Sequence, residues 1–200
     1  MTPEAAFLDS KFLFANQPLT LYRLARAKYA NLSGVGAAQF PGRWNRDGQE
    51  AIYTSTEQST TVLERLVHTP KDSIPSNLAL MTIRVSGNWR QARWTSNEMK
   101  VFESGMGDPH TGGSFWFYRS LADAQSDFSS AHSIFDLDIN PFAVAVPSVI
   151  VPVWNVVLYP QGVGFWDHVA LEAVEHFDLD SRLFPDSTPI ETFDLLDDDL

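Results

Sequence analysis

Two arginines near a glycine-rich segment are the first side chains in this sequence that could bind an anionic ligand. Arg43 lies in the segment Gly-Arg-Trp-Asn at 42–45, and Arg23 lies in an alternating apolar and polar stretch that precedes it. An arginine presents a planar fork of donors that suits phosphate oxygens, and glycine lets the backbone approach a ligand closely. The two arginines could therefore hold a diphosphate. In the alternative interpretation, Arg43 pairs with a surface acid and Trp44 packs on the core.

Glu64 is the carboxylate that could act on such a ligand. It is spaced at i, i+4 intervals from Thr60 and His68, so the three side chains share one face of an expected helix. If this face borders a cleft, Glu64 can stabilise positive charge during a reaction. If it does not, Glu64 is a solvated residue paired with Arg65 or His68.

Tyr53 and Ser148 complete the set of candidate residues. Tyr53 lies in a short expected strand, where its ring either stacks on a flat ligand or fills the core. Ser148 interrupts a very apolar stretch, and a buried hydroxyl needs a hydrogen-bond partner. That partner is a backbone carbonyl, a ligand ribose or an arginine. Because the Gly-x-Ser-x-Gly context is absent, Ser148 is not expected to be a nucleophile.

The elements that would position these residues follow one another irregularly. Alternating or β-branched apolar runs predict strands at 19–24, 51–54, 78–85, 143–146, 149–151 and 155–159. The glycines predict a long loop over 34–48. Because there is no regular βαβ order, the sequence predicts an α+β fold rather than a doubly wound sheet.

Two helices are expected among these strands. Ser55 or Thr56 can cap the first, which ends near His68. Its apolar stripe, expected to face the core, consists of Val62, Leu63, Leu66 and Val67. The second helix is expected over 167–177, with its first residue, an aspartate, as the cap.

Composition and charge argue against several classes of protein. The chain has 14 Lys and Arg against 25 Asp and Glu, and the formal net charge of −11 repels the phosphate backbone of nucleic acids. It has no cysteine, and its histidines show no metal-ligand spacing, so disulfides and zinc sites are not expected. Walker A and Gly-x-Gly-x-x-Gly motifs are absent. No apolar stretch suits a membrane span or a signal peptide, so we expect a cytoplasmic protein.

Taken together, these pieces resemble the RES domain, a family named for its Arg, Glu and Ser. The resemblance lies in YRLAR, GRWN, IYTS, VLERLVH, AVAVPSVIVP and NVVLYP, which occur in the family's order between Leu19 and Asp180. It implies a single RES-like domain over 1–185. The acidic residues that crowd the end of the sequence predict a solvated tail over 186–200. The resemblance also implies a split mixed β-sheet with flanking helices, similar to the fold of ADP-ribosyltransferases.

The resemblance implies a function as well. Members of the family are toxins of toxin–antitoxin systems that deplete cellular NAD by cleaving its nicotinamide–ribose bond, through hydrolysis or phosphorolysis. Carried over to this sequence, the catalytic residues would be Arg43, Glu64 and Tyr53, and the NAD-binding residues would be Arg23, Arg43, Tyr53 and Ser148. NAD is then a substrate, with inorganic phosphate as a second one in phosphorolysis, and neither a cofactor nor a metal is implied. The partner protein would be a helix-turn-helix antitoxin.

Two other functions stay open from the sequence. An ADP-ribosyltransferase that modifies a protein or an RNA would use the same cleft. A non-catalytic protein-binding module would use the aromatic-rich segment 87–130 as its contact surface. No direct contact with nucleic acid or membrane is expected, and a homodimer is compatible with the sequence.

Overall fold

The computed structural model describes residues 18–70, 75–87, 89–94, 99–104, 114–118, 141–151 and 153–184. The strands in these residues are β1 Leu19–Arg26, β2 Ile52–Ser55, β3 Leu78–Val85, β4 Trp89–Trp94, β5 Met99–Ser104, β6 Ser114–Tyr118, β7 Ala143–Pro147, β8 Trp154–Leu158 and β9 Val169–Phe177. They form one sheet in the order β4-β5-β6-β7-β8-β2-β1-β3-β9. Neighbouring strands are antiparallel, except that β6 and β7 are parallel.

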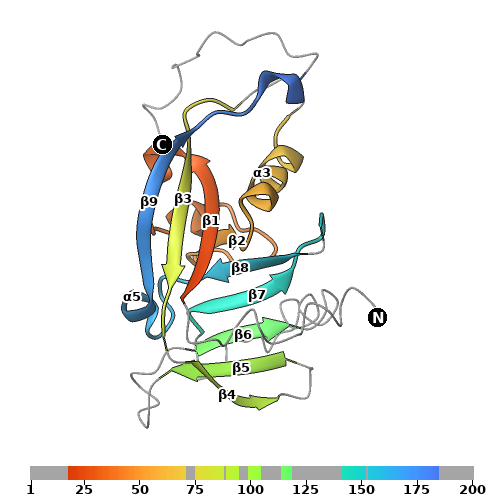
Figure 1. Ribbon diagram of the computed structural model, residues 1–200. Helices are drawn as coiled ribbons and strands as arrows, with labels where there is room; N and C mark the ends of the chain where they lie inside the picture. The colour runs from red at the N-terminus through yellow and green to blue at the C-terminus, as the bar shows by residue number, and fades with distance from the viewer. Residues whose placement is uncertain are drawn as a thin grey trace.

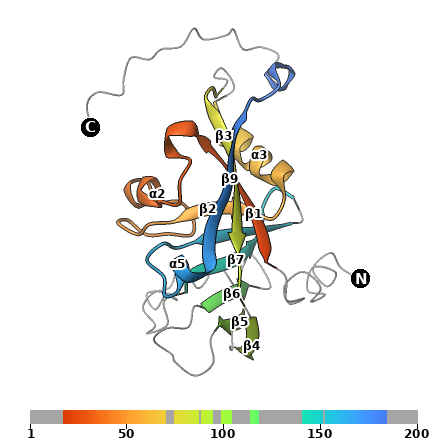
Figure 2. The same ribbon diagram turned by 60° about the vertical axis from the view of Figure 1, so that its left-hand side comes forward.

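Short helices flank this sheet. They are α2 Val35–Gln39, α3 Gln58–Val67 and α5 Phe165–His168, with 3-10 turns η2 Ala27–Tyr29 and η4 Ser181–Leu183. Figure 2 shows α2 and α3 on opposite sides of the group formed by β1, β3 and β9. A mixed sheet with flanking helices confirms the predicted α+β class. Within the described ranges, no helix has the length and apolarity needed to cross a membrane.

The sheet changes direction between β1 and β2, and this change creates the core. Figure 1 shows β1, β3 and β9 running across the direction of β7 and β8. Only Tyr22 and Ser55 are in register between β1 and β2, whereas β1 pairs with β3 along its whole length. The two groups of strands pack against one shared core, which includes Leu21, Met81, Ile83, Ile52, Phe142, Val156 and Leu158.

Alternation along β1 separates its side chains into two sets. Leu21 and Ala25 belong to the shared core, whereas Tyr22 and Leu24 belong to a small cluster that packs against α3. Because successive side chains of a strand point to opposite faces, Arg23 lies on the face of Leu21 and Ala25. The strand itself was predicted, and the structure confirms it.

The apolar stripe predicted for α3 is not the face that the helix buries, so this prediction is wrong. Leu63 and Val67 are 38% and 64% exposed, whereas the buried residues of α3 are Thr60 and Thr61. Val62 alone of these apolar side chains packs against the small cluster on β1 and β3. Thr61 Oγ1 donates to a backbone carbonyl of β1 at 3.1 Å. The buried hydroxyl of Thr61 therefore has a hydrogen-bond partner on the sheet.

The predicted caps of this helix are also wrong, although its end is confirmed. The N-cap residue is Glu57, which makes no side-chain cap hydrogen bond, and the C-cap residue is His68. Ser55 and Thr56 instead donate their hydroxyls to the carbonyl of Trp154, at 3.3 Å each. These two bonds tie the turn before α3 to β8.

The segment predicted as a helix over 167–177 is mainly a strand. The helix α5 ends at His168, and β9 then pairs with β3 along the whole of that strand, with one irregularity after Thr82. Its alanine and glutamate residues favour a helix. Without β9, however, β3 would expose a full row of unpaired backbone groups. Pairing with β3 therefore overrides the local propensity.

Three other parts of the chain differ from the sequence-based expectation. The predicted loop 34–48 contains α2, because Ala38 N–H bonds to the carbonyl of Gly34 at 3.1 Å. The predicted strand 149–151 is a turn between β7 and β8. The aromatic-rich segment 87–130 contributes β4, β5 and β6, and its remaining residues lie outside the described ones, as does the tail 186–200.

Candidate functional site

The carboxylate of Glu64 accepts two hydrogen bonds through a single oxygen. Its Oε1 accepts from Asn155 Nδ2 at 2.6 Å and from Ser148 Oγ at 3.0 Å. Glu64 lies on α3, while Asn155 lies on β8 and Ser148 directly follows β7, so one hairpin brings both donors to the helix. We call Glu64, Ser148 and Asn155 the carboxylate cluster. In the described part of the chain, Glu64 pairs with neither Arg65 nor His68. Glu64 is therefore not the solvated residue paired with Arg65 or His68 that the alternative interpretation expected.

The turn after β7 directs the Ser148 hydroxyl toward Glu64. Ile150 N–H donates to Ser148 Oγ at 3.1 Å, and Ser148 N–H donates to the carbonyl of Val153 at 2.9 Å. A serine hydroxyl has one proton, which Ser148 donates to the carboxylate. The partner of this hydroxyl is therefore a carboxylate, which was not among the partners considered from the sequence.

A second set of hydrogen bonds organises the loop that carries Arg43. Asn45 Oδ1 accepts from the Tyr53 hydroxyl and from Gly42 N–H, both at 2.8 Å. Trp44 N–H donates to the Tyr53 hydroxyl at 2.9 Å. We call Gly42, Trp44, Asn45 and Tyr53 the loop cluster. Its hydrogen bonds join the Tyr53 hydroxyl to the backbone of Trp44 and to the side chain of Asn45, so Tyr53 anchors the loop.

The same loop is anchored to its surroundings at two further points. Asn45 Nδ2 donates to the carbonyls of Ala37 at 2.8 Å and Gln49 at 3.0 Å. The hydroxyl of Tyr159, just after β8, donates to the carbonyl of Trp44 at 2.7 Å. Asn45 is only 6% exposed, and a buried amide needs such partners. These bonds hold the loop against the end of β8.

The Tyr53 hydroxyl keeps its proton at ordinary pH and acts as a hydrogen-bond donor. Burial raises its pKa to about 12, although the hydrogen bond from Trp44 N–H and the positive charge of Arg43 both act in the opposite direction. The hydroxyl therefore stays protonated and donates a hydrogen bond to Asn45. The packing around it is close, since a Cβ added at Gly42 would lie 2.5 Å from the Tyr53 oxygen. Glycine at 42 is thus required by the approach of the ring.

Arg43 projects from this loop into solvent. Its guanidinium carbon lies 5.9 Å from the centre of the Trp44 ring, and Trp44 itself is buried. Among the described residues Arg43 has no ion-pair partner, so it does not pair with a surface acid as the alternative interpretation expected. Trp44 is buried, as that interpretation expected. An exposed guanidinium can turn its fork of donors toward an incoming anion.

Arg23 is held in a different place. Its Nη1 donates to the carbonyl of Asn31 at 3.1 Å, and burial lowers the pKa of its guanidinium. Asn31 lies in the segment that leads from β1 to α2, on the other side of β1 from α3, as Figure 2 shows. No hydrogen bond or ion pair in the described part of the chain joins Arg23 to Glu64. That both meet one ligand stays a prediction.

One face of the β2–β8 pair connects the carboxylate cluster to the loop cluster. Ser55 is in register with Asn155, and Tyr53 is in register with Val157. Tyr53 and Asn155 therefore share one face and are diagonal neighbours, with backbones roughly 7–8 Å apart. The loop covers this face at Tyr53, and α3 covers it at Asn155, above β8 in Figure 1. A cation, an aromatic ring and a carboxylate thus border one surface.

Comparison with known proteins then gives the family. The family described as "RES domain" matches residues 20–180. This chain belongs to the RES-domain family. The matched range includes both clusters of the candidate site, and it also includes Arg23, which the structure places apart from them.

Relatives of this RES-domain protein carry the name Toxin Res. The protein of Photorhabdus laumondii is 32% identical over 181 residues, which cover 82% of this chain and 97% of the relative. Those of Yersinia enterocolitica and Pseudomonas putida are 36% and 32% identical over 69 and 77 residues, or 34% and 38% of this chain and 45% and 52% of theirs. A chain in the crystal structure of the M. tuberculosis MbcT–MbcA toxin–antitoxin complex aligns with a TM-score of 0.47 and 16% identity, over 85% of this chain and 88% of that one.

Two asparagines of this RES-domain site were not singled out from the sequence. Asn45 and Asn155 appeared only as letters of the GRWN and NVVLYP segments. A polar residue inside an apolar strand, the signal that drew attention to Ser148, would also have drawn attention to Asn155. In the described ranges, no group of three or more histidine or acidic side chains is placed to hold a metal ion.

Proposed function

We propose that this RES-domain protein is the toxin of a toxin–antitoxin system and that it degrades NAD by cleaving the bond between nicotinamide and ribose. The observation that carries the proposal is the carboxylate cluster, in which Glu64 is fixed by two donors beside Tyr53 and the loop of Arg43. The names of its relatives, Toxin Res, support the toxin assignment, and a toxin of such a system has an antitoxin as its proposed protein partner.

The chemistry of NAD suits a site with one carboxylate. The nicotinamide ring is a cation, so when its bond to ribose breaks, the electron pair neutralises the ring and the leaving group needs no proton. Positive charge develops on the ribose, as in glycoside cleavage, and an ionised carboxylate beside it lowers the barrier. An oxygen of water or of phosphate then bonds to the same carbon. The products are nicotinamide with ADP-ribose and a proton, or nicotinamide with phosphorylated ADP-ribose.

Each residue of the site has a role in this proposal. Glu64 faces the ribose, and Tyr53 stacks near the nicotinamide. Arg43 binds the diphosphate or an attacking phosphate, which its exposed position allows. Ser148 lies at the ribose and holds Glu64. Arg23 holds the diphosphate together with Arg43, for which it has to leave the carbonyl of Asn31.

The test is incubation of the pure protein with NAD, with and without phosphate, followed by mass spectrometry of the products. Free ADP-ribose identifies a hydrolase, and phosphorylated ADP-ribose identifies a phosphorylase. An adduct on a protein or an RNA would instead identify a transferase. Intact NAD, together with no heat of NAD binding in calorimetry, would refute the proposal in favour of a non-catalytic module.

A further inference from the structure

Asn155 is an unusual residue for its position in β8. Its strand neighbours Trp154, Val156, Val157 and Leu158 are all buried, and asparagine is disfavoured in strands. Its Oδ1 is buried and has no hydrogen-bond partner among the described residues. A buried acceptor without a donor destabilises a protein. An apolar or β-branched residue would suit this strand better, so the presence of the amide calls for another reason.

The other end of the amide supplies that reason. Asn155 Nδ2 donates to Glu64 Oε1 at 2.6 Å, the shorter of the two bonds to that oxygen. The orientation of the amide follows from this contact, because Oδ1 in place of Nδ2 would face the carboxylate with no proton between them. The Oδ1 of Asn155 is thus left without a hydrogen-bond donor, while its Nδ2 is placed on the carboxylate of Glu64.

The two donors of the carboxylate cluster leave half of the carboxylate open. Both bonds end on Oε1, and in the described part of the chain Glu64 Oε2 accepts no hydrogen bond. Two donors from different directions fix both the position and the plane of a carboxylate. The open oxygen is thereby held in one direction relative to β8.

The uncharged nature of the donor also matters. A lysine or arginine at this position would hold the carboxylate equally well, but it would cancel the negative charge that a cationic transition state needs. An amide donates a hydrogen bond without adding charge. Asn155 can therefore keep Glu64 both fixed and fully negative.

We propose that Asn155 is the positioning residue of this site, which holds Glu64 so that Oε2 faces the ribose of NAD. This inference rests on the proposed function. It predicts that changes at Asn155 act on kcat and on its pH dependence, and hardly on NAD affinity, because Asn155 acts through Glu64.

The first test replaces Asn155 with aspartate. In Asn155→Asp two carboxyl groups lie at hydrogen-bond distance and share one proton, so the ionised Glu64 needed for the reaction appears only at higher pH. We expect the acid limb of the kcat profile to move up by at least about one pH unit. The matched control is Asn77→Asp, at an exposed turn with φ of 53°, which aspartate tolerates as asparagine does. Its profile should equal that of the parent. An Asn155→Asp profile with the parental shape would overturn the proposal.

The second test replaces Asn155 with leucine, and it has a readout that does not need activity. We expect kcat to fall by about tenfold or more, as for loss of a hydrogen bond to a charged group, with the NAD dissociation constant changed less than about threefold. A crystal structure of Asn155→Leu should show the Glu64 carboxylate moved away from Ser148.

The outcomes of these tests separate the two proposals. A Glu64 side chain that kept its position in Asn155→Leu would refute the positioning role, whatever the protein does with NAD. If the parent protein left NAD intact, the proposed function would fail, and a displaced Glu64 would still support the positioning role. Thermal unfolding of each variant shows whether a loss of activity is a loss of folded protein.

Discussion

The carboxylate cluster and the loop cluster border the same face of β2 and β8, but they are built in opposite ways. In the carboxylate cluster the hydrogen bonds end on the reactive group itself, the Oε1 of Glu64. In the loop cluster they end on the loop backbone and on Asn45, and Arg43 is left exposed. The difference indicates a fixed carboxylate for the chemical step and a cation that is free to follow the ligand.

This contrast leads to a division of kinetic roles. A group that must be placed before the reaction is held rigidly, because misplacement lowers the rate of the chemical step. A group that captures a charged ligand works from an exposed side chain on an anchored loop. Changes in the carboxylate cluster should therefore lower kcat, and changes in the loop cluster should weaken NAD binding or the fold.

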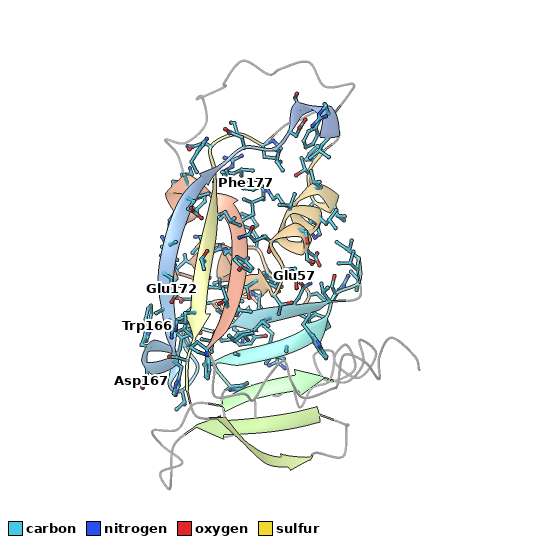
Figure 3. The ribbon with its side chains drawn as sticks, viewed as in Figure 1. Glu57, Trp166, Asp167, Glu172 and Phe177 are labelled. Carbon is cyan, nitrogen blue, oxygen red and sulfur yellow. The ribbon has the colours of Figure 1, made fainter. Side chains whose placement is uncertain are left out.

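The largest effect is expected for Glu64→Gln. Loss of the charge that stabilises the transition state should lower kcat for NAD cleavage by about 10²–10³, as for removal of one electrostatic stabiliser. The control is Glu172→Gln on β9, whose carboxylate pairs with Arg84 on the surface and which Figure 3 shows far from the Glu57 end of α3. A Glu64→Gln enzyme with parental turnover would remove the carboxylate from the mechanism.

The next largest effect is expected for Arg43→Ala. Loss of charge-assisted hydrogen bonds of roughly 1.5–3 kcal/mol should raise KM for NAD by about 10- to 100-fold and leave kcat nearly unchanged. Steady-state kinetics measures both, and Arg84→Ala, which removes an exposed pair of little energetic weight, is the control. If Arg43→Ala lowered kcat alone, the division between the two clusters would be wrong.

A smaller effect is expected for Ser148→Ala. Glu64 loses one of its two donors but keeps Asn155, so kcat should fall by about tenfold, the range for a hydrogen bond to a charged group. Ser86→Ala is the matched control, because the Ser86 hydroxyl bonds only weakly to the carbonyl of His168, at 3.5 Å. A rise in KM without a fall in kcat would place Ser148 among the binding residues only.

For Tyr53→Phe we expect the loss to appear in stability. Removal of the hydroxyl leaves Trp44 N–H without its acceptor and Asn45 with one donor fewer, which should lower the free energy of unfolding by about 1–3 kcal/mol. Urea unfolding measures the change. Tyr22→Phe, in the small cluster under α3, is the control, because its hydroxyl makes no hydrogen bond to the described residues. Equal stability of both variants would show that the hydroxyl does not anchor the loop.

The stability difference between the parent and Tyr53→Phe should also depend on pH. The folded-state pKa of Tyr53 is raised from 10.0 to about 12, so above pH 10 the unfolded chain loses this proton before the folded chain does. The contribution of the hydroxyl is thus complete below pH 10 and declines as the pH rises toward about 12. Unfolding at pH 8, 10 and 11 should show the difference shrinking, and a constant difference would contradict the raised pKa.

The sequence by itself was sufficient for the elements whose signal is local. The strands β1, β3, β7 and β8 and the position of α3 follow from periodicity, because alternation and helical spacing are properties of adjacent residues. The strand predicted over 149–151 was wrong. The order of short motifs was likewise enough to indicate the RES family, which the match over 20–180 confirmed.

Tertiary structure decided the features that depend on partners far along the chain. The segment over 169–177 looks helical by composition and is a strand because β3 needs a neighbour. The helix α3 buries Thr60 and Thr61 instead of most of its apolar stripe, and a carbonyl of β1 accepts the hydrogen bond of Thr61. Glu64 meets its donors across separations of 84 and 91 residues, and a hydrogen bond of that range leaves no trace in local periodicity.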